Sequence, residues 1–184
     1  SVLVKDNKVS IIRNNSETIE SDNVIDCSGK IISPGFIDLH SHTALTIFGE
    51  PEHKPKVFQG VTTEMVGIDG ISPVPFKNKS ELERYIWLDS GLNDYPPNSP
   101  DWLKTIDYLN KIDNKVAVNV ACIIGNSPLR IWSVGWDQVE ASKDQIADMK
   151  SALRECMEEG AWGFSTGLDY APGAYASTEE LISL

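Results

Sequence analysis

Positive charge and cysteine are both scarce in this sequence. The 184 residues include 16 Lys and Arg against 27 Asp and Glu, which gives a formal net charge of −11 at pH 7. An acidic surface repels phosphate backbones and anionic lipid headgroups, which argues against binding to nucleic acid or to a membrane surface. The three cysteines, Cys27, Cys122 and Cys156, have no CxxC spacing and indicate reduced intracellular thiols rather than a disulfide framework.

Several sequence signals are also absent. No run approaches the roughly 18 apolar residues that a membrane span requires, and the start, SVLVKDNKV, lacks the layout of a secretory leader. The chain has no GxGxxG, GxxxxGKS/T or GxSxG motif, so neither a phosphate-binding loop nor a serine nucleophile is indicated. We therefore expect a soluble cytoplasmic protein whose partner is a small molecule.

The order of elements predicts an α/β fold. Short strands joined by a tight turn are expected at residues 2–4 and 9–12, with a weaker strand at 19–25. Helix-start signals occur at Ser80, Ser99-Pro100, Ser142 and Ser177. They alternate with runs that are apolar on both faces, as in buried parallel strands, at residues 31–39, 61–71, 116–124 and 161–165.

The chain resembles part of a larger fold. Its last helix starts at Ser177 and the sequence stops at Leu184, and it begins without Met. Four strands with their helices are half of an eight-stranded barrel, which takes about 250 residues. We expect both ends to be missing, and the 184-residue piece alone to be inactive and poorly soluble because strand edges stay unpaired.

The segment PGFIDLHSH carries the strongest chemical signal. His40 and His42 are two residues apart at the end of an apolar run, so an extended chain places both imidazoles on one face, with Asp38 one step deeper. A chance pair in a loop is the alternative. Two neutral nitrogens on a rigid strand end suit a divalent metal of the zinc type. His53, in a charged and proline-bounded loop, is expected to be a solvated surface residue.

Further candidates follow the later strands. Asp69 stands between glycines in GIDG, where it is either a turn residue or a carboxylate that faces the two histidines. Arg130 could pair with an anionic substrate, although an exposed loop arginine is the commoner case. The segment FSTGLDY at residues 164–170 offers hydroxyls, including that of Tyr170, to a substrate, or else forms a simple turn.

These motifs together resemble a known family. GKIISPGFIDLHSH looks like the first barrel strand of the amidohydrolase superfamily. Its continuation, FQGVTTEMVGIDGISPVP, is similar to the N-acyl-D-amino-acid deacylases, or D-aminoacylases. NVACIIGNSPLR and MEEGAWGFSTGLDYAPGAYASTEEL are similar to later stretches of that family, in the same order.

The resemblance implies a fold and a site. Residues 31–184 would be the first half of a metal-dependent (β/α)8 TIM barrel, and residues 1–30 part of a small β-sandwich domain. His40 and His42 match paired metal ligands, Asp69 stands where well-studied members carry a metal-binding cysteine, and Tyr170 matches a substrate-contacting tyrosine. Ala44 departs from the Asp of many relatives. The remaining histidines and the proton-shuttling aspartate would lie beyond Leu184.

The resemblance also implies a reaction, and two alternative functions stay open beside it. A metal-bound hydroxide, with Zn²⁺ as the expected metal, would attack the acyl carbonyl of an N-acyl-D-amino acid. A dihydroorotase-like or hydantoinase-like cyclic amidohydrolase is the alternative enzyme. A non-catalytic barrel used for binding or assembly is the alternative from another class. The acyl group, the metal and the oligomeric state, including a homo-oligomer, stay open.

Overall fold

The computed structural model describes residues 1–6, 8–11 and 21–184, which divide into two compact units, Ser1–Pro34 and Gly35–Leu184. In the smaller unit, β1 (Val2–Lys5) and β2 (Lys8–Ile11) form the predicted antiparallel hairpin. The strand predicted at 19–25 is wrong for residues 21–25, which are not in a strand, and residues 19 and 20 lie outside the described part. Val24 and Ile25 are exposed.

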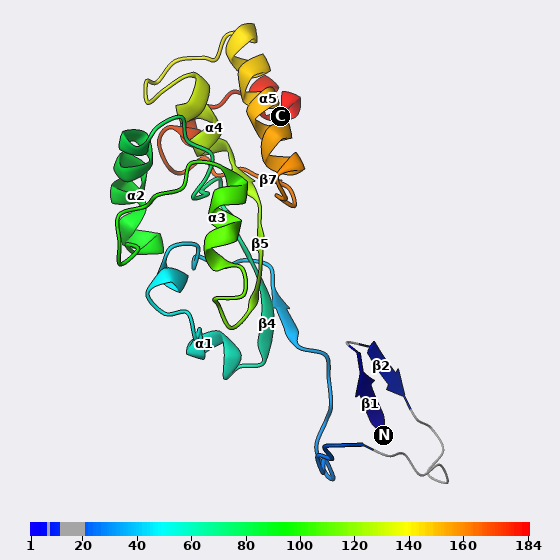
Figure 1. The fold of residues 1–184 in the computed structure, drawn as a ribbon. Coiled ribbons are helices and arrows are strands. Elements are labelled where there is room, and N and C mark those ends of the chain that lie inside the picture. Colours follow the sequence, from blue (N-terminus) through cyan, green and yellow to red (C-terminus); the bar gives the residue numbers. More distant parts are fainter. Residues whose placement is uncertain (7, 12–20) are drawn as a thin grey trace. The chain divides into compact units, whose positions relative to one another are not determined.

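Parallel strands run through the larger unit in sequence order (Figure 1). β3 (Phe36–Asp38), β4 (Val61–Val66) and β5 (Asn119–Cys122) form one sheet with β4 in the middle. β6 (Ile124–Gly125) pairs with β7 (Phe164–Ser165). Only Ile123 separates β5 from β6, and its N–H donates to the Val66 carbonyl at 2.9 Å, so these pairings follow one another along the chain.

Helices separate most of the strands, which confirms the predicted mixture of strand and helix. They are η1 (Thr46–Phe48), α1 (Lys54–Val57), α2 (Lys79–Asn93), α3 (Thr105–Ile112), α4 (Asn126–Ser133), α5 (Lys143–Glu158), η2 (Gly173–Tyr175) and α6 (Thr178–Ser183). The apolar core draws on strands and helices alike, with Val66, Leu82, Tyr108, Leu129 and Met149 fully buried. Removing this apolar area from water is the main stabilising contribution to the unit.

Two of the predicted helix starts are confirmed and two are wrong. Ser142 caps α5 by accepting from the Gln145 N–H, and Ser177 caps α6 in the same way. In α2 the cap is Asn78, two residues before Ser80: the Asn78 side chain accepts from the Glu81 N–H at 3.0 Å, and the Ser80 hydroxyl donates to Asn78 instead of capping the helix. The helix predicted from Ser99 begins only after Lys104.

The apolar run 31–39 departs most from its predicted form. Only Phe36–Asp38 is a strand, and Ile31, Ile37 and Leu39 are exposed. β3 is the edge of its sheet in the described residues and pairs with β4 alone. The buried strand predicted here is therefore wrong for this chain, since no second neighbour covers it.

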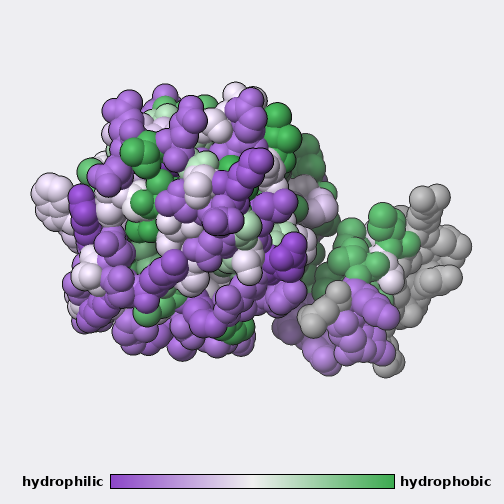
Figure 2. Space-filling view, turned by 90° about the horizontal axis from the view of Figure 1, so that it is seen from above, coloured by the Kyte–Doolittle hydropathy of each residue, from purple (hydrophilic) through white to green (hydrophobic). Residues whose placement is uncertain are grey.

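Polar and charged residues cover most of the larger unit on the face shown in Figure 2, in keeping with the acidic composition. Among the described residues, no helix is both long and apolar enough to cross a membrane. All three cysteines are free. Burial raises the pKa of Cys122 to about 12 and that of Cys156 to about 11, so neither thiol forms a thiolate nucleophile near neutral pH.

A tight turn follows β4 and carries Asp69. Gly67, Asp69 and Gly70 all have positive φ, at 88°, 54° and 71°. The Ser165 hydroxyl from β7 locks this turn, since it donates to the Gly67 carbonyl at 2.5 Å and accepts from the Gly70 N–H at 3.1 Å. The turn is packed so closely that a Cβ on Gly70 would lie 2.4 Å from the Gly167 backbone nitrogen.

One carboxylate of α2 is half-hidden from water. Asn93 donates to the Asp89 carboxylate from one helical turn away. Burial raises the pKa of Asp89 to about 6, and the hydrogen bond from Asn93 offsets only part of that rise. Asp89 is therefore charged at neutral pH at a cost to the folded state.

We expect Gly70→Ala to destabilise the larger unit by about 3 kcal/mol or more, because it adds an overlap with backbone to the strain of a positive φ. The matched control is Gly135→Ala, since Gly135 has φ 94° but nothing within 4 Å of an added Cβ. That control carries the backbone strain alone, about 1–2 kcal/mol. Urea unfolding of the full-length protein measures both, and equal losses would contradict the close packing of the turn.

We expect Asp89→Asn to stabilise the protein increasingly as pH rises from 4.5 to 7. The folded pKa of about 6 lies above the unfolded value of about 3.9, so the unfolded chain loses its proton first and wild-type stability falls across this window. At about 1.4 kcal/mol per pKa unit, discounted for partial solvation, the variant gains about 1–2 kcal/mol at pH 7. A gain independent of pH in urea unfolding would rule out this origin.

Candidate metal centre

The two histidines lie on the loop that leaves β3. The strand ends at Asp38, and His40 and His42 come just after it. The loop still runs beside β4, because the Ser41 N–H donates to the Met65 carbonyl at 3.1 Å. The Ser41 hydroxyl points to Glu64, whereas the two imidazoles point to Asp69.

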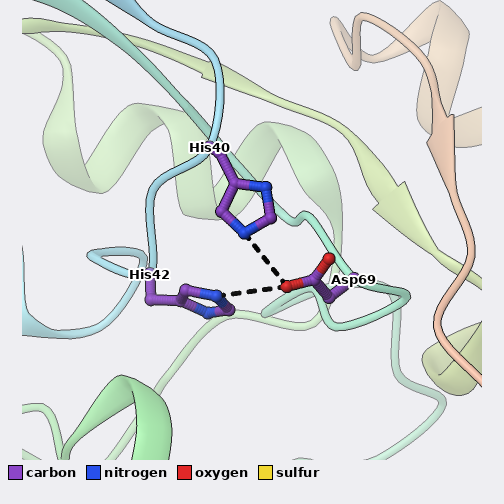
Figure 3. Close-up of side chains that lie close together, drawn as sticks. All are labelled: His40, His42 and Asp69. Carbon is purple, nitrogen blue, oxygen red and sulfur yellow. Dashed lines mark ion pairs between the residues drawn. The ribbon is translucent and has the colours of Figure 1, made fainter. Parts of the chain in front are cut away.

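Asp69 faces both imidazoles from the turn after β4 (Figure 3). Its Oδ2 atom lies 3.1 Å from His40 Nε2 and 3.2 Å from His42 Nε2. The two rings are 5.4 Å apart between centroids and meet edge to face. The structure thus brings together the three residues that the sequence nominated as metal ligands, and Asp69 is also a positive-φ turn residue, so both interpretations of it hold.

The donor set and spacing fit a divalent metal. One ligand atom from each of the three residues lies within 4.8 Å of the others. Two imidazole nitrogens and a carboxylate oxygen suit zinc, and ligand atoms of a tetrahedral site with bonds of about 2.0–2.1 Å lie about 3.3 Å apart. The side chains of His40, His42 and Asp69 are 63%, 25% and 42% exposed, so the centre is open to incoming molecules.

Asp38 supports the histidine loop and does not join the three. Its Oδ1 atom accepts from the His40 N–H at 3.0 Å, and its Oδ2 atom pairs with Lys56. The hydrogen bond from Lys56, followed by that from the His40 backbone, lowers the pKa of Asp38. Asp38 is therefore a fixed anion that holds the backbone of a candidate ligand.

The prediction that His53 is a solvated surface residue is wrong. His53 is 5% exposed, and its Nδ1 atom lies 3.4 Å from Glu64 Oε1. The residue precedes α1 with φ 48°, and this left-handed backbone directs the ring inward. A buried acid on β4 supplies a partner that the surrounding charged loop residues did not reveal.

Arg130 is not the exposed loop residue that is the commoner case. It lies on α4 with its side chain fully buried, paired with Glu180 of α6, and its Nη2 atom donates to the Val139 carbonyl at 2.7 Å. A buried guanidinium requires an opposite charge nearby, and Glu180 supplies it. The substrate-binding prediction for Arg130 is therefore corrected to a structural ion pair.

Residues 164–170 begin in β7 and continue into the loop that follows it. Ser165 holds the Asp69 turn, and Asn126 ties the loop down by accepting from the Gly167 N–H and donating to the Gly173 carbonyl. Tyr170 follows the strand and is 46% exposed. Tyr170 therefore stays a predicted substrate contact, open to solvent.

Sequence reasoning missed Glu64. This acid lies on β4 with no exposed surface, on the same face as Val66. The available signal was a single charge in the apolar stretch VTTEMVG, two residues before a buried valine. Its partners are Ser41 and Thr43, the residues that alternate with the two histidines.

Comparison with known proteins gives consistent results. A profile described as the amidohydrolase family matches residues 23–182. D-aminoacylase of Alcaligenes xylosoxydans xylosoxydans is 37% identical over 161 residues, covering 87% of this chain and 32% of that protein.

Two solved structures also match the chain. One is N-acyl-D-glutamate deacylase from Bordetella bronchiseptica, complexed with zinc and a phosphonate inhibitor, with a TM-score of 0.71, 34% identity and coverage of 86% of this chain and 32% of that one. The other is a D-aminoacylase studied for its binuclear metal centre, with a TM-score of 0.67, 36% identity and coverage of 82% and 31%.

The extent of these matches defines what they establish. The chain spans about a third of the length of the relatives it matches, so those proteins contain regions that have no counterpart here. Within the chain, by contrast, the family profile leaves only the first 22 residues and the last two unmatched. This chain belongs to the amidohydrolase family.

Proposed function

We propose that the full-length protein is a metal-dependent amide hydrolase that removes the acyl group from N-acyl-D-amino acids. The observation that carries the proposal is the convergence of His40, His42 and Asp69 at the carboxyl ends of adjacent parallel strands. The similarity to D-aminoacylase and to N-acyl-D-glutamate deacylase supports the choice of substrate class. These relatives also favour linear amides over the cyclic amides of the alternative enzymes.

The proposed fold is the first half of a (β/α)8 barrel at residues 31–184, beside part of a β-sandwich domain at residues 1–30. Parallel strands in sequence order, separated mainly by helices, support the barrel. The exposed apolar residues of β3 support a neighbour outside this chain, since Phe36 and Ile37 are uncovered here. The antiparallel hairpin of β1 and β2 supports the sandwich.

His40, His42 and Asp69 would hold the metal, for which we propose Zn²⁺. When bound, such an ion makes water a nucleophile at neutral pH and polarises a carbonyl oxygen. Replacement of a thiolate by Asp69 at this position gives a harder donor, because carboxylate oxygen is less polarisable than sulfur. The remaining ligands of the relatives' sites would come from beyond Leu184.

The chain's other residues bear on substrate contact and on the choice between metal-assisted and covalent catalysis. Half-exposed Tyr170, after β7, is the proposed substrate contact. The buried thiols of Cys122 and Cys156 are protonated near neutral pH, so covalent catalysis through them is excluded. We propose that the residue which moves the proton to the leaving amine is an aspartate outside this chain. A cytoplasmic location and a small-molecule partner fit this chemistry.

The metal assignment predicts which histidines matter. In the purified full-length protein, His40→Ala, His42→Ala and Asp69→Ala should each lower bound zinc by at least about tenfold, because each removes a direct ligand. Asp89→Asn is the control, since Asp89 lies on α2 with Asn93 as its partner and is not one of the three. Metal content by mass spectrometry decides, and loss of zinc in the control alone would reject the assignment.

The substrate assignment predicts hydrolysis of N-acyl-D-amino acids. The full-length protein should release free D-amino acid from N-acetyl derivatives, lose this activity after chelation and regain it with Zn²⁺. The L-enantiomers, dihydroorotate and hydantoin serve as the comparison panel. Turnover of the cyclic amides alone would replace this function with the cyclic amidohydrolase alternative. Zinc binding without turnover of any of these would favour a non-catalytic barrel.

A further inference from the structure

Glu64 is a charged residue in a place where charge is costly. Its side chain on β4 has no exposed surface. A carboxylate taken out of water is strongly destabilised unless hydrogen bonds and opposite charges replace its hydration. Loss of any hydrogen bond or opposite charge around Glu64 therefore costs a substantial free energy, and this cost keeps its partners in place.

Two hydroxyl groups supply the hydrogen bonds. Ser41 Oγ donates to Glu64 Oε2 at 2.8 Å, and Thr43 Oγ1 donates to Glu64 Oε1 at 2.8 Å. Each carboxylate oxygen thus takes one hydroxyl from the same short stretch of loop. The two hydroxyl oxygens also lie 3.0 Å from each other, so the three side chains form a closed triangle.

Basic groups complete the surroundings. Lys56 Nζ lies 3.8 Å from Glu64 Oε2 and also pairs with Asp38. His53 Nδ1 lies 3.4 Å from Glu64 Oε1, beyond good hydrogen-bond geometry. Lys56 therefore joins the two acids on either side of the histidine loop, with Asp38 holding the His40 backbone and Glu64 holding the hydroxyls.

We propose that Glu64 is a positioning residue for the metal centre, which fixes the loop 40–43 so that His40 and His42 face Asp69. The proposal rests on the proposed metal site. It follows from the contacts of the loop: Ser41 and Thr43 point to Glu64, whereas His40 and His42 point to Asp69. Tying Ser41 and Thr43 to Glu64 therefore leaves both imidazoles on the side of Asp69.

The strand that carries Glu64 also carries Asp69. β4 ends at Val66, and the turn that follows it holds Asp69 in place through Ser165. One strand thus supplies both the third candidate ligand and the anchor for the first two. Outer groups that orient metal ligands typically change metal affinity 10–100-fold when removed.

The experiment measures Zn²⁺ and Co²⁺ affinity of the full-length protein by titration against a competing chelator, together with the visible spectrum of bound Co²⁺. Glu64→Gln should weaken binding about 10–100-fold and alter the Co²⁺ spectrum. Glu180→Gln is the matched control, since Glu180 is another fully buried carboxylate of the same unit, paired with Arg130. It should lower the unfolding midpoint while leaving metal affinity and spectrum unchanged.

A milder pair of variants decides the question even where Glu64→Gln does not fold. Thr43→Val keeps the shape of the side chain and removes one hydroxyl, so it should weaken metal binding several-fold, whereas Thr43→Ser keeps the hydroxyl and should bind within about twofold of wild type. Wild-type affinity and spectrum in Thr43→Val, or equal weakening in Thr43→Ser or Glu180→Gln, would overturn the positioning role. Absence of metal binding by the wild type would instead overturn the proposed function, and this inference with it.

Discussion

The parallel pairing of β4 with its two neighbours is the constraint on which the site depends. Thr63–Val66 pair with Asn119–Cys122 on one side, and Ile37 and Asp38 pair with Thr63 and Glu64 on the other. Because of this register, the loop that follows β3 runs beside the turn that follows β4. The two histidines of that loop therefore lie close to Asp69. A slip of one residue would turn Glu64 from the buried face to the other and leave Ser41 and Thr43 without their acceptor.

The three candidate ligands could be named from the sequence because their signals are local. His40 and His42 share a face in any extended chain, and Asp69 stands in a glycine-flanked turn whose geometry its own neighbours demand. The caps at Ser142 and Ser177 are local in the same way, because each hydroxyl needs only an N–H three residues ahead. The meeting of the three candidate ligands then required one further rule, that parallel strands end at a common edge.

The errors about burial come from partners that lie outside the local motif. His53 is buried against Glu64 of the following strand β4, and Arg130 is buried against Glu180, 50 residues away. Each of the four side chains alone is typical of a solvated surface, and only the pairing makes burial tolerable. The start of α2 failed for another reason: Asn78 and Ser80 both suit a cap, and the structure uses Asn78 while Ser80 donates to it. Competition between adequate local signals cannot be resolved without the packing around them.

The exposure of strand β3 and the openness of the candidate metal centre have a common explanation in the proposed fold. Ile37 is apolar and exposed, and the side chains of His40 and Asp69 are accessible to solvent. All three residues lie within the part of the chain that the family profile matches. A strand that pairs on one edge only loses the stabilisation of the second ladder, and three donors leave a divalent ion short of a closed shell. In a barrel completed by further strands, the same addition would cover β3 and bring the remaining ligands. Folding and metal binding would then be coupled, because the segment that buries β3 would also complete the metal site.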